Sequence, residues 1–280
     1  MESFKIDNGL IVCITGDIDY FRVETIERLE PYLSLLDRYG VKATFFVTAK
    51  AAEEYPERVE YILKNDHLIE GHGDVHEGFY ESESVQIDRL NAMKNVFSQV
   101  FDLEIEGFRA PWYKHNHTTY LAVDRAGLKY DCSKKRFEIA FKGIPFVQKR
   151  YMDMVMYPYA KPLLELVGSL YNTYSKSPRI PYHITPNVLE FPTLGISDYS
   201  LIGDPRGPRY RPDESIKIGE IWAECLTSLK QKGGGVLTLQ AHPCRVSPAY
   251  LASLEYFIQH ALHLGAVFST PSDLVGAVPR

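Results

Sequence analysis

Residues 10–19 read LIVCITGDID, an apolar, largely β-branched run that ends in Gly16 and two aspartates. A continuous apolar run of this length is typical of a strand buried on both faces, as in parallel α/β sheets. Asp17 and Asp19 stand at its carboxyl end, where ligands and catalytic groups gather in such folds. An Asp-x-Asp pair alone more often forms a turn and a helix N-cap, and only its position after a buried strand favours a functional interpretation.

The chain beyond this strand alternates between helical and strand patterns. Apolar residues at helical spacing predict helices over residues 24–39, 56–65, 82–101, 118–126 and 250–264. Short apolar runs predict strands over residues 42–48, 67–71, 128–131, 188–192, 236–240 and 266–270, a further strand ending at Phe108, and a closing turn or helix over 271–275. Alternation of strand and helix is typical of a parallel sheet, so the sequence predicts an α/β fold.

Residues 70–80, EGHGDVHEGFY, place His72 and His76 four positions apart among glycines. Two imidazoles at this spacing can converge on one side of a turn. A divalent cation held by two histidines usually takes one carboxylate and keeps a position open for water. Because Asp19 and His72 both follow strands of one parallel sheet, they should lie at the same rim. We therefore predict Asp19 as the third ligand.

Two more charged or titratable side chains follow predicted strands. Arg109, in the segment RAPW, can hold a carboxylate through two hydrogen bonds, although an ordinary surface ion pair beside a packed Trp112 explains it equally well. His242 follows strand 236–240. A lone histidine is more often structural, but its place among the other rim residues favours a general acid or base.

Composition limits the class of protein. With 280 residues, 45% of them hydrophobic, the chain can bury a large core. A net charge of -5 argues against nucleic-acid and anionic-membrane partners. The first residues lack the pattern of a signal peptide, and no apolar run reaches the length of a membrane span. The four scattered cysteines are typical of reduced thiols, so we expect a cytoplasmic protein.

The motifs D-x-D, H-x-x-x-H, R-x-P-W, Y-D-x-S and a late H-P occur in this order between Val12 and about Ser272. Together they resemble the polysaccharide deacetylase superfamily, also called the NodB-homology or carbohydrate esterase family four fold. The resemblance implies a distorted, incomplete (β/α) barrel forming a single catalytic domain over residues 1–280. Because Ile18 separates the aspartates, the first motif is similar to the branch of intracellular peptidoglycan deacetylases, allantoinase-like amidases and lipid-linked aminosugar deformylases. Gly73 departs from the usual Ser or Thr.

The resemblance also implies roles for individual residues. It makes Asp17 the general base, Arg109 the group that orients it, His242 the general acid, and Asp19, His72 and His76 the metal ligands. The metal is most often zinc in this family, and cobalt, nickel or manganese serve in some members. We assign Trp112, Tyr113 and Asp131 to substrate binding. Asp131 can instead tune His242 or merely cap its strand, and the capping role is slightly favoured.

The chemistry of these residues fits metal-assisted amide hydrolysis, and the resemblance implies that the substrate is an amino sugar or glycoconjugate from which an N-acetyl or N-formyl group is removed. Amide hydrolysis needs a nucleophile at neutral pH, a Lewis acid for the carbonyl oxygen and a proton for the leaving nitrogen. Two alternatives stay open: a cyclic amide or ureide hydrolase of the allantoinase kind, and a non-catalytic metal- or glycan-binding relic.

An insertion rich in tyrosine and proline spans about residues 137–212. Aromatic faces suit sugar rings, but these tyrosines can equally pack against the barrel or form a homo-oligomer interface. Within the insertion, the loop GDPRGPRYRP carries Arg206, Arg209 and Arg211. These arginines can bind a phosphate or carboxylate, although such a loop is more often simply solvated.

Overall fold

The structure is a computed structural model that describes residues 9–136, 179–208 and 210–278. Its strands are β1 (Leu10–Ile18), β2 (Ala43–Val47), β3 (Leu68–Gly71), β4 (Gly107–Phe108), β5 (Tyr130–Asp131), β6 (Lys135–Arg136), β7 (Tyr182–His183), β8 (Leu189–Glu190), β9 (Thr193–Leu194), β10 (Gly235–Gln240) and β11 (Val267–Phe268). They form one sheet in the order β6-β9-β10-β1-β2-β3-β4-β5-β8-β7, with β11 also paired to β1. Only the β7–β8 pairing is antiparallel among these strands.

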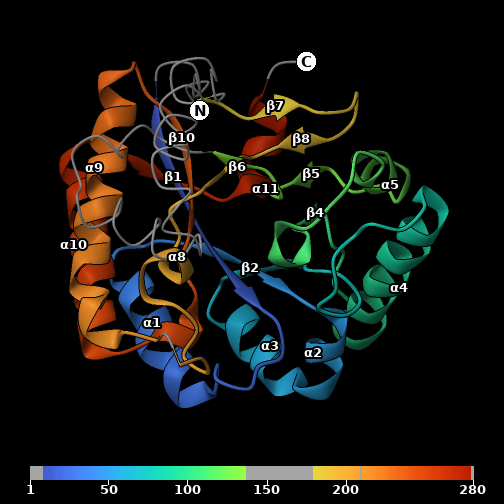
Figure 1. Cartoon of the computed structure of the whole chain (residues 1–280), viewed down its shortest axis with the longest axis horizontal. Coiled ribbons are helices and arrows are strands. Elements are labelled where there is room, and N and C mark those ends of the chain that lie inside the picture. Colours follow the sequence, from blue (N-terminus) through green and yellow to red (C-terminus); the bar gives the residue numbers. More distant parts are fainter. Residues whose placement is uncertain (1–8, 137–178, 209, 279–280) are drawn as a thin grey trace, which may run out of the picture.

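Most of the helices lie around the outside of this curved sheet, whereas the short helix α11 (Pro271–Leu274) lies among the strands (Figure 1). The other helices are α1 (Ile26–Arg38), α2 (Ala49–Glu54), α3 (Pro56–Lys64), α4 (Glu83–Phe101), α5 (Thr119–Arg125), α8 (Asp198–Ile202), α9 (Ile218–Gln231) and α10 (Pro248–His263), with 3-10 turns at Pro111–Tyr113, Pro212–Lys217, Pro243–Arg245 and Val275–Ala277. None of the helices in the described ranges is long and apolar enough to cross a membrane. The predicted α/β fold, a distorted and incomplete barrel, is confirmed.

Alternation along β1 gives the strand two different apolar faces. Val12 and Ile14 belong to the large apolar cluster that includes the helices, whereas Ile11 and Cys13 belong to a smaller second cluster. Burying a side chain of this size contributes roughly 1.5–3 kcal/mol. Because side chains alternate between faces, Asp17 shares its face with Ile11 and Cys13. The candidate site therefore begins on the same face of β1 as the smaller apolar cluster.

The strand register explains why distant residues meet at one rim. The residues in line across six neighbouring strands are Ile18, Val47, Gly71, Phe108, Asp131 and Glu190. Asp19, His72 and Arg109 each directly follow one member of this line. Parallel strands leave the sheet in the same direction, so these three side chains start from the same edge.

Most predicted elements are present with small shifts at their ends. The structure adds helices that the sequence analysis did not predict, namely α2, α8 and α9. The last predicted strand is shorter than expected and covers only Val267–Phe268. Part of the predicted insertion, residues 137–178, lies outside the described residues.

A buried histidine in the core should make stability depend on pH. His67 is 4% exposed and its Nδ1 accepts a hydrogen bond of 3.1 Å from the backbone N–H of Ala43. Burial lowers the pKa of His67 to about 4, with Asp66 and Asp37 opposing it and Lys42 adding to it. The unfolded chain takes up this proton near pH 6.5. Between these values the unfolded state binds more protons, so stability falls as the pH is lowered.

Replacing His67 by asparagine should remove that part of the pH dependence. The asparagine Oδ1 can take the place of Nδ1 as acceptor for the N–H of Ala43, and an amide does not titrate. Urea unfolding of the wild type should lose on the order of 2–3 kcal/mol between pH 7 and pH 4 through this group. His117→Asn, at an exposed site, is the control. An identical slope in wild type and His67→Asn would contradict the assignment.

Candidate active site

Three predicted metal ligands converge at the carboxyl rim of β1 and β3. Oδ1 of Asp19 lies 3.0 Å from Nε2 of His76 and 3.6 Å from Nε2 of His72. One ligand atom from each residue falls within 4.8 Å of the other two. Both histidines are buried, whereas the Asp19 side chain is 23% exposed. The cluster can therefore be reached from solvent through the carboxylate side.

The surroundings of the histidines suit a bound cation. Nδ1 of His72 lies 2.7 Å from the carbonyl oxygen of Arg109, to which it donates in the tautomer that leaves Nε2 free. Burial lowers the pKa of His72 although Asp17 and Asp19 oppose the shift, and this favours the neutral imidazole that binds metal. Two imidazole nitrogens and one carboxylate oxygen form a donor set that fits zinc and similar divalent ions.

Asp17 lies between the candidate ligands and the late histidine. Its Oδ1 accepts a 2.7 Å hydrogen bond from Nη1 of Arg109, and its Oδ2 accepts one from Nε2 of Gln240. Oδ2 is also 3.9 Å from Nε2 of both His72 and His242. Burial alone would raise the pKa of Asp17, but the charge of Arg109, followed by the two histidines, holds it well below its usual range. The carboxylate is ionised and can accept a proton.

Arg109 is fully buried and its side chain is held on several sides. Nη2 donates to Oγ1 of Thr15 at 2.9 Å and to Oγ1 of Thr193 at 3.1 Å, and Nε donates to the carbonyl of Cys132 at 3.2 Å. The guanidinium is therefore a fixed clamp on Asp17 and not the surface ion pair that was the alternative interpretation.

The structure gives His242 a partner that sequence reasoning missed. Nδ1 of His242 lies 2.6 Å from Oδ1 of Asp198, the first residue of α8, and the backbone N–H of His242 donates to Oδ2 at 2.6 Å. The hydroxyl of Tyr250 also donates to Oδ2, at 2.8 Å. Burial raises the pKa of Asp198, but Arg245 and His242 outweigh it and keep the carboxylate ionised. Asp198 thereby orients the ring of His242.

Asp131 is not the residue that orients the ring of His242. It is fully buried, and its two carboxylate oxygens accept hydrogen bonds from the backbone N–H and the hydroxyl of Ser133, at 2.7 and 2.9 Å. Burial raises its pKa although the neighbouring Glu190 and Ser133 act against it. These hydrogen bonds fit the capping role at the end of its strand. The assignment of Asp131 to substrate binding stays a prediction.

Trp112 and Tyr113 lie beside the cluster. The Trp112 ring is 55% exposed and its centroid lies 4.4 Å from that of His76. The ring of Tyr113 lies 5.6 Å from Cζ of Arg109. Both residues have positive φ angles, 54° and 59°, which are costly for residues with side chains and are common near functional sites. Trp112 offers an exposed aromatic ring beside the candidate ligands, with Nζ of Lys114 4.7 Å from its centroid.

The arginine loop is only partly described, because Arg209 lies outside the described residues. Nη2 of Arg206 comes within 3.9 Å of Oδ2 of Asp19, and the same guanidinium holds Asp204 at 2.7 and 2.9 Å. Arg211 pairs with Glu214 at 3.3 Å. The loop therefore reaches the candidate site through Arg206.

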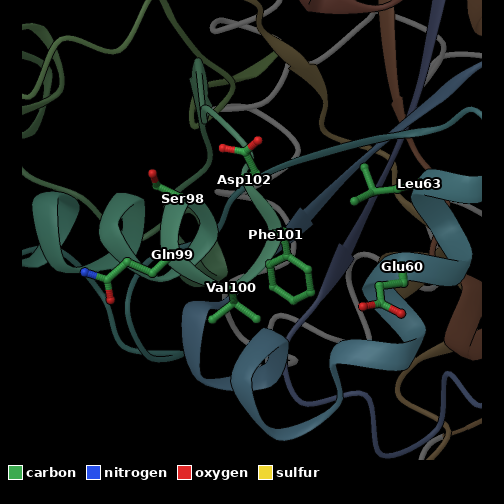
Figure 2. Close-up of a pocket in the computed structure, with 7 residues that line it drawn as sticks. All are labelled: Glu60, Leu63, Ser98, Gln99, Val100, Phe101 and Asp102. Carbon is green, nitrogen blue, oxygen red and sulfur yellow. The ribbon is translucent and has the colours of Figure 1, made fainter.

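A surface hollow elsewhere on the molecule is not part of this site. Its volume is about 500 Å3, and it lies between α3 and the carboxyl end of α4, where Leu63 and Glu60 face Phe101 and Val100 (Figure 2). These helix ends precede β3 and β4, so the hollow opens at the amino ends of the strands. In barrels of this kind, catalytic groups gather at the opposite rim.

Comparison with known proteins agrees with this arrangement. Residues 11–130 match the family model described as polysaccharide deacetylase. A peptidoglycan deacetylase-like protein of Gibberella zeae is 31% identical over 104 residues, which cover 36% of this chain and 31% of that relative. The match thus spans about a third of that curated protein.

Solved structures show the same fold. One chain from Mycobacterium smegmatis, assigned as a polysaccharide deacetylase, superposes with a TM-score of 0.69 at 19% identity, covering 99% of this chain and 92% of the other. An allantoinase superposes with a TM-score of 0.67 at 15% identity, covering 96% and 89%. This chain is thus similar to polysaccharide deacetylases over residues 11–130, and it shares its fold with these solved structures.

Proposed function

We propose that this protein is a metal-dependent hydrolase that removes an N-acetyl or N-formyl group from an amino sugar or glycoconjugate. The observation that carries the proposal is the position of Asp17, whose Oδ2 lies 3.9 Å from both His72 and His242. A base is thereby adjacent to a candidate metal ligand on one side and to a candidate acid on the other. Amide hydrolysis needs both proton transfers within one small site.

Each residue would have one task in the reaction. A divalent metal bound by Asp19, His72 and His76, which we propose to be zinc with cobalt, nickel or manganese as substitutes, would supply a Lewis acid and a water of lowered pKa. Asp17 takes a proton from the attacking water. His242, held by Asp198, donates a proton to the leaving nitrogen.

Positioning falls to residues around these groups. Arg109 and Gln240 hold the two oxygens of Asp17, so the carboxylate is both ionised and aimed. Trp112 provides an exposed ring beside His76, on which a sugar face can stack. The presence of base, ligand set, clamp and oriented histidine in one place supports turnover over a binding relic.

Elemental analysis with a parallel activity assay tests this proposal. Wild-type protein should bind about one divalent ion per chain and release acetate or formate from N-acylated amino sugars. His72→Ala/His76→Ala should lose both properties, because a single carboxylate cannot hold the ion. His260→Ala/His263→Ala removes two histidines of α10 and should change neither. Retention of metal and turnover in the His72/His76 variant would overturn the assignment.

A further inference from the structure

Several cations around the candidate site lie over aromatic rings and not beside carboxylates. The pairs, with the distance from the cationic atom to the ring centroid, are Lys135 and Tyr113 at 4.4 Å, Lys114 and Trp112 at 4.7 Å, and Arg22 and Tyr20 at 5.1 Å. A ring attracts a cation through its quadrupole and does not cancel its charge. These three side chains are exposed, so their charge faces solvent at the mouth of the site.

The rings under these cations are the ones that border the site. Tyr20 and Trp112 contact His76, with centroid distances of 5.7 and 4.4 Å, and Tyr113 lies 5.6 Å from Cζ of Arg109. Elsewhere cations are commonly paired with acids. Examples are Lys42 with Asp66, Arg89 with Asp74 and Arg38 with Glu255. In the part of the chain that the structure describes, no ion pair involves the three cations at the mouth.

Lys135 is the cation on the side of the candidate base. It lies on β6 opposite Thr193 of β9 in the strand register. Thr193 accepts a hydrogen bond from Arg109, which in turn holds Asp17. Although Lys135 is exposed to solvent, the protein atoms packed around its ammonium lower its pKa by partial desolvation; the charge of Asp17 opposes this shift and that of Arg109 adds to it, so the ammonium is close enough to feel both charges.

Arg206, on the side of Asp19, differs from these three cations because it is paired with an acid. Its Nε and Nη2 are both occupied by Asp204, so this charge is largely neutralised within the loop. Nη2 also lies 3.9 Å from the outer oxygen of Asp19. Arg206 is therefore placed to support a candidate metal ligand, whereas the ammonium of Lys135 remains available to a ligand.

The balance of charge at the site is positive, although the whole chain carries a net charge of -5. Asp17 is compensated by Arg109 and Asp204 by Arg206. The two positive charges of a divalent ion would exceed the single negative charge of Asp19. The three cations at the mouth add further positive charge. A cleft with one sign of charge concentrates ligands of the opposite sign, and a neutral sugar gains nothing from it.

We propose, on the basis of the hydrolase function above, that the substrate is an amino sugar that carries an oxyanion near its N-acyl group, and that Lys135 binds this oxyanion. A lysine ammonium binds phosphate and carboxylate alike as a compact point charge. Lys135 is a specificity-determining residue and takes no part in bond breaking.

Competition between neutral and anionic sugars tests the proposal. The substrates are glucosamine, glucosamine 1-phosphate and muramic acid, each N-acetylated or N-formylated. Wild-type kcat/KM should favour one anionic sugar over the neutral one by about 10-fold, the effect of one hydrogen bond to a charged group. Salt should reduce this preference, and K135Q should abolish it. The anionic sugar with the higher kcat/KM shows whether the site prefers the phosphate of glucosamine 1-phosphate or the carboxylate of muramic acid.

The control is K42Q, which removes the same charge from a lysine paired with Asp66 at the amino end of β2. It should keep the wild-type preference. Equal kcat/KM values for neutral and anionic sugars in the wild type, or a preference that survives in K135Q, would overturn the proposal and leave the deacylase function standing.

Calorimetric binding in the presence of the divalent ion decides the case where no sugar releases acid. That result would contradict the hydrolase function itself. Tighter binding of the anionic sugar by the wild type, lost in K135Q, would still support the role of Lys135. Absence of binding, or equal binding of the two sugars, would overturn it.

Discussion

Replacing Asp17 by asparagine is expected to lower kcat by about 10²- to 10⁴-fold while leaving the metal content unchanged. The amide cannot accept a proton, yet its size and its contact with Arg109 are preserved. Arg109 keeps its other acceptors in Thr15, Thr193 and Cys132, so the fold should survive. Steady-state acid release, metal analysis and circular dichroism on the same preparation measure the three properties together.

Asp37→Asn is the matched control, because it makes the same chemical change at an exposed position of α1. It should turn over like the wild type. Normal turnover in Asp17→Asn would sink the base assignment. Loss of metal in that variant would instead make Asp17 part of the ligand set.

Replacing Asp198 by asparagine is expected to have the second large effect. With its Oδ1 kept toward the donors of Tyr250 and the His242 backbone, asparagine presents an N–H group to Nδ1 of His242. The ring must then accept at Nδ1 and can no longer hold protons on both nitrogens. Loss of a carboxylate that orients a catalytic histidine costs about 10²- to 10⁴-fold in kcat.

Stability should also fall in this variant. Arg245 is 2% exposed and lies 3.6 Å from Asp198, and it would lose its carboxylate partner. Removing one partner of a buried ion pair costs about 3–5 kcal/mol. Tyr250→Phe removes only one neutral donor to the same carboxylate and should cost about 1 kcal/mol with a smaller loss of kcat. A folded Asp198→Asn protein with wild-type kcat would contradict the role of Asp198.

Local sequence patterns were sufficient to predict which residues lie at the rim of the sheet. The apolar run before Asp17 predicted a strand, and parallel pairing then required Asp19, His72 and Arg109 to leave the sheet on the same side. Such inferences hold because strand direction and alternation are set locally. The roles of these residues in binding and catalysis stay predictions.

The partner of His242 could not be predicted from the sequence, because this contact depends on packing that no local sequence pattern encodes. Asp198 lies 44 positions before His242 and begins α8, a helix of five residues that is too short to show periodicity. A faint signal existed, since Ser197 and Ser200 form a capping box at that helix start. Motif order alone left Asp131 two roles, tuning His242 or capping its strand, with capping slightly favoured. Its hydrogen bonds to Ser133 show that position at a rim does not decide where a side chain points.

The central place of β1 in the sheet orders the assembly of the site during synthesis. Residues 10–76 contain β1, β2, β3 and all three candidate ligands, so this segment can pair as soon as it leaves the ribosome. The pairing of Thr15 with Gln240, in contrast, closes a loop of more than 200 residues and waits for the end of the chain. The candidate metal ligands and His242 are thus brought into place at separate stages of biogenesis.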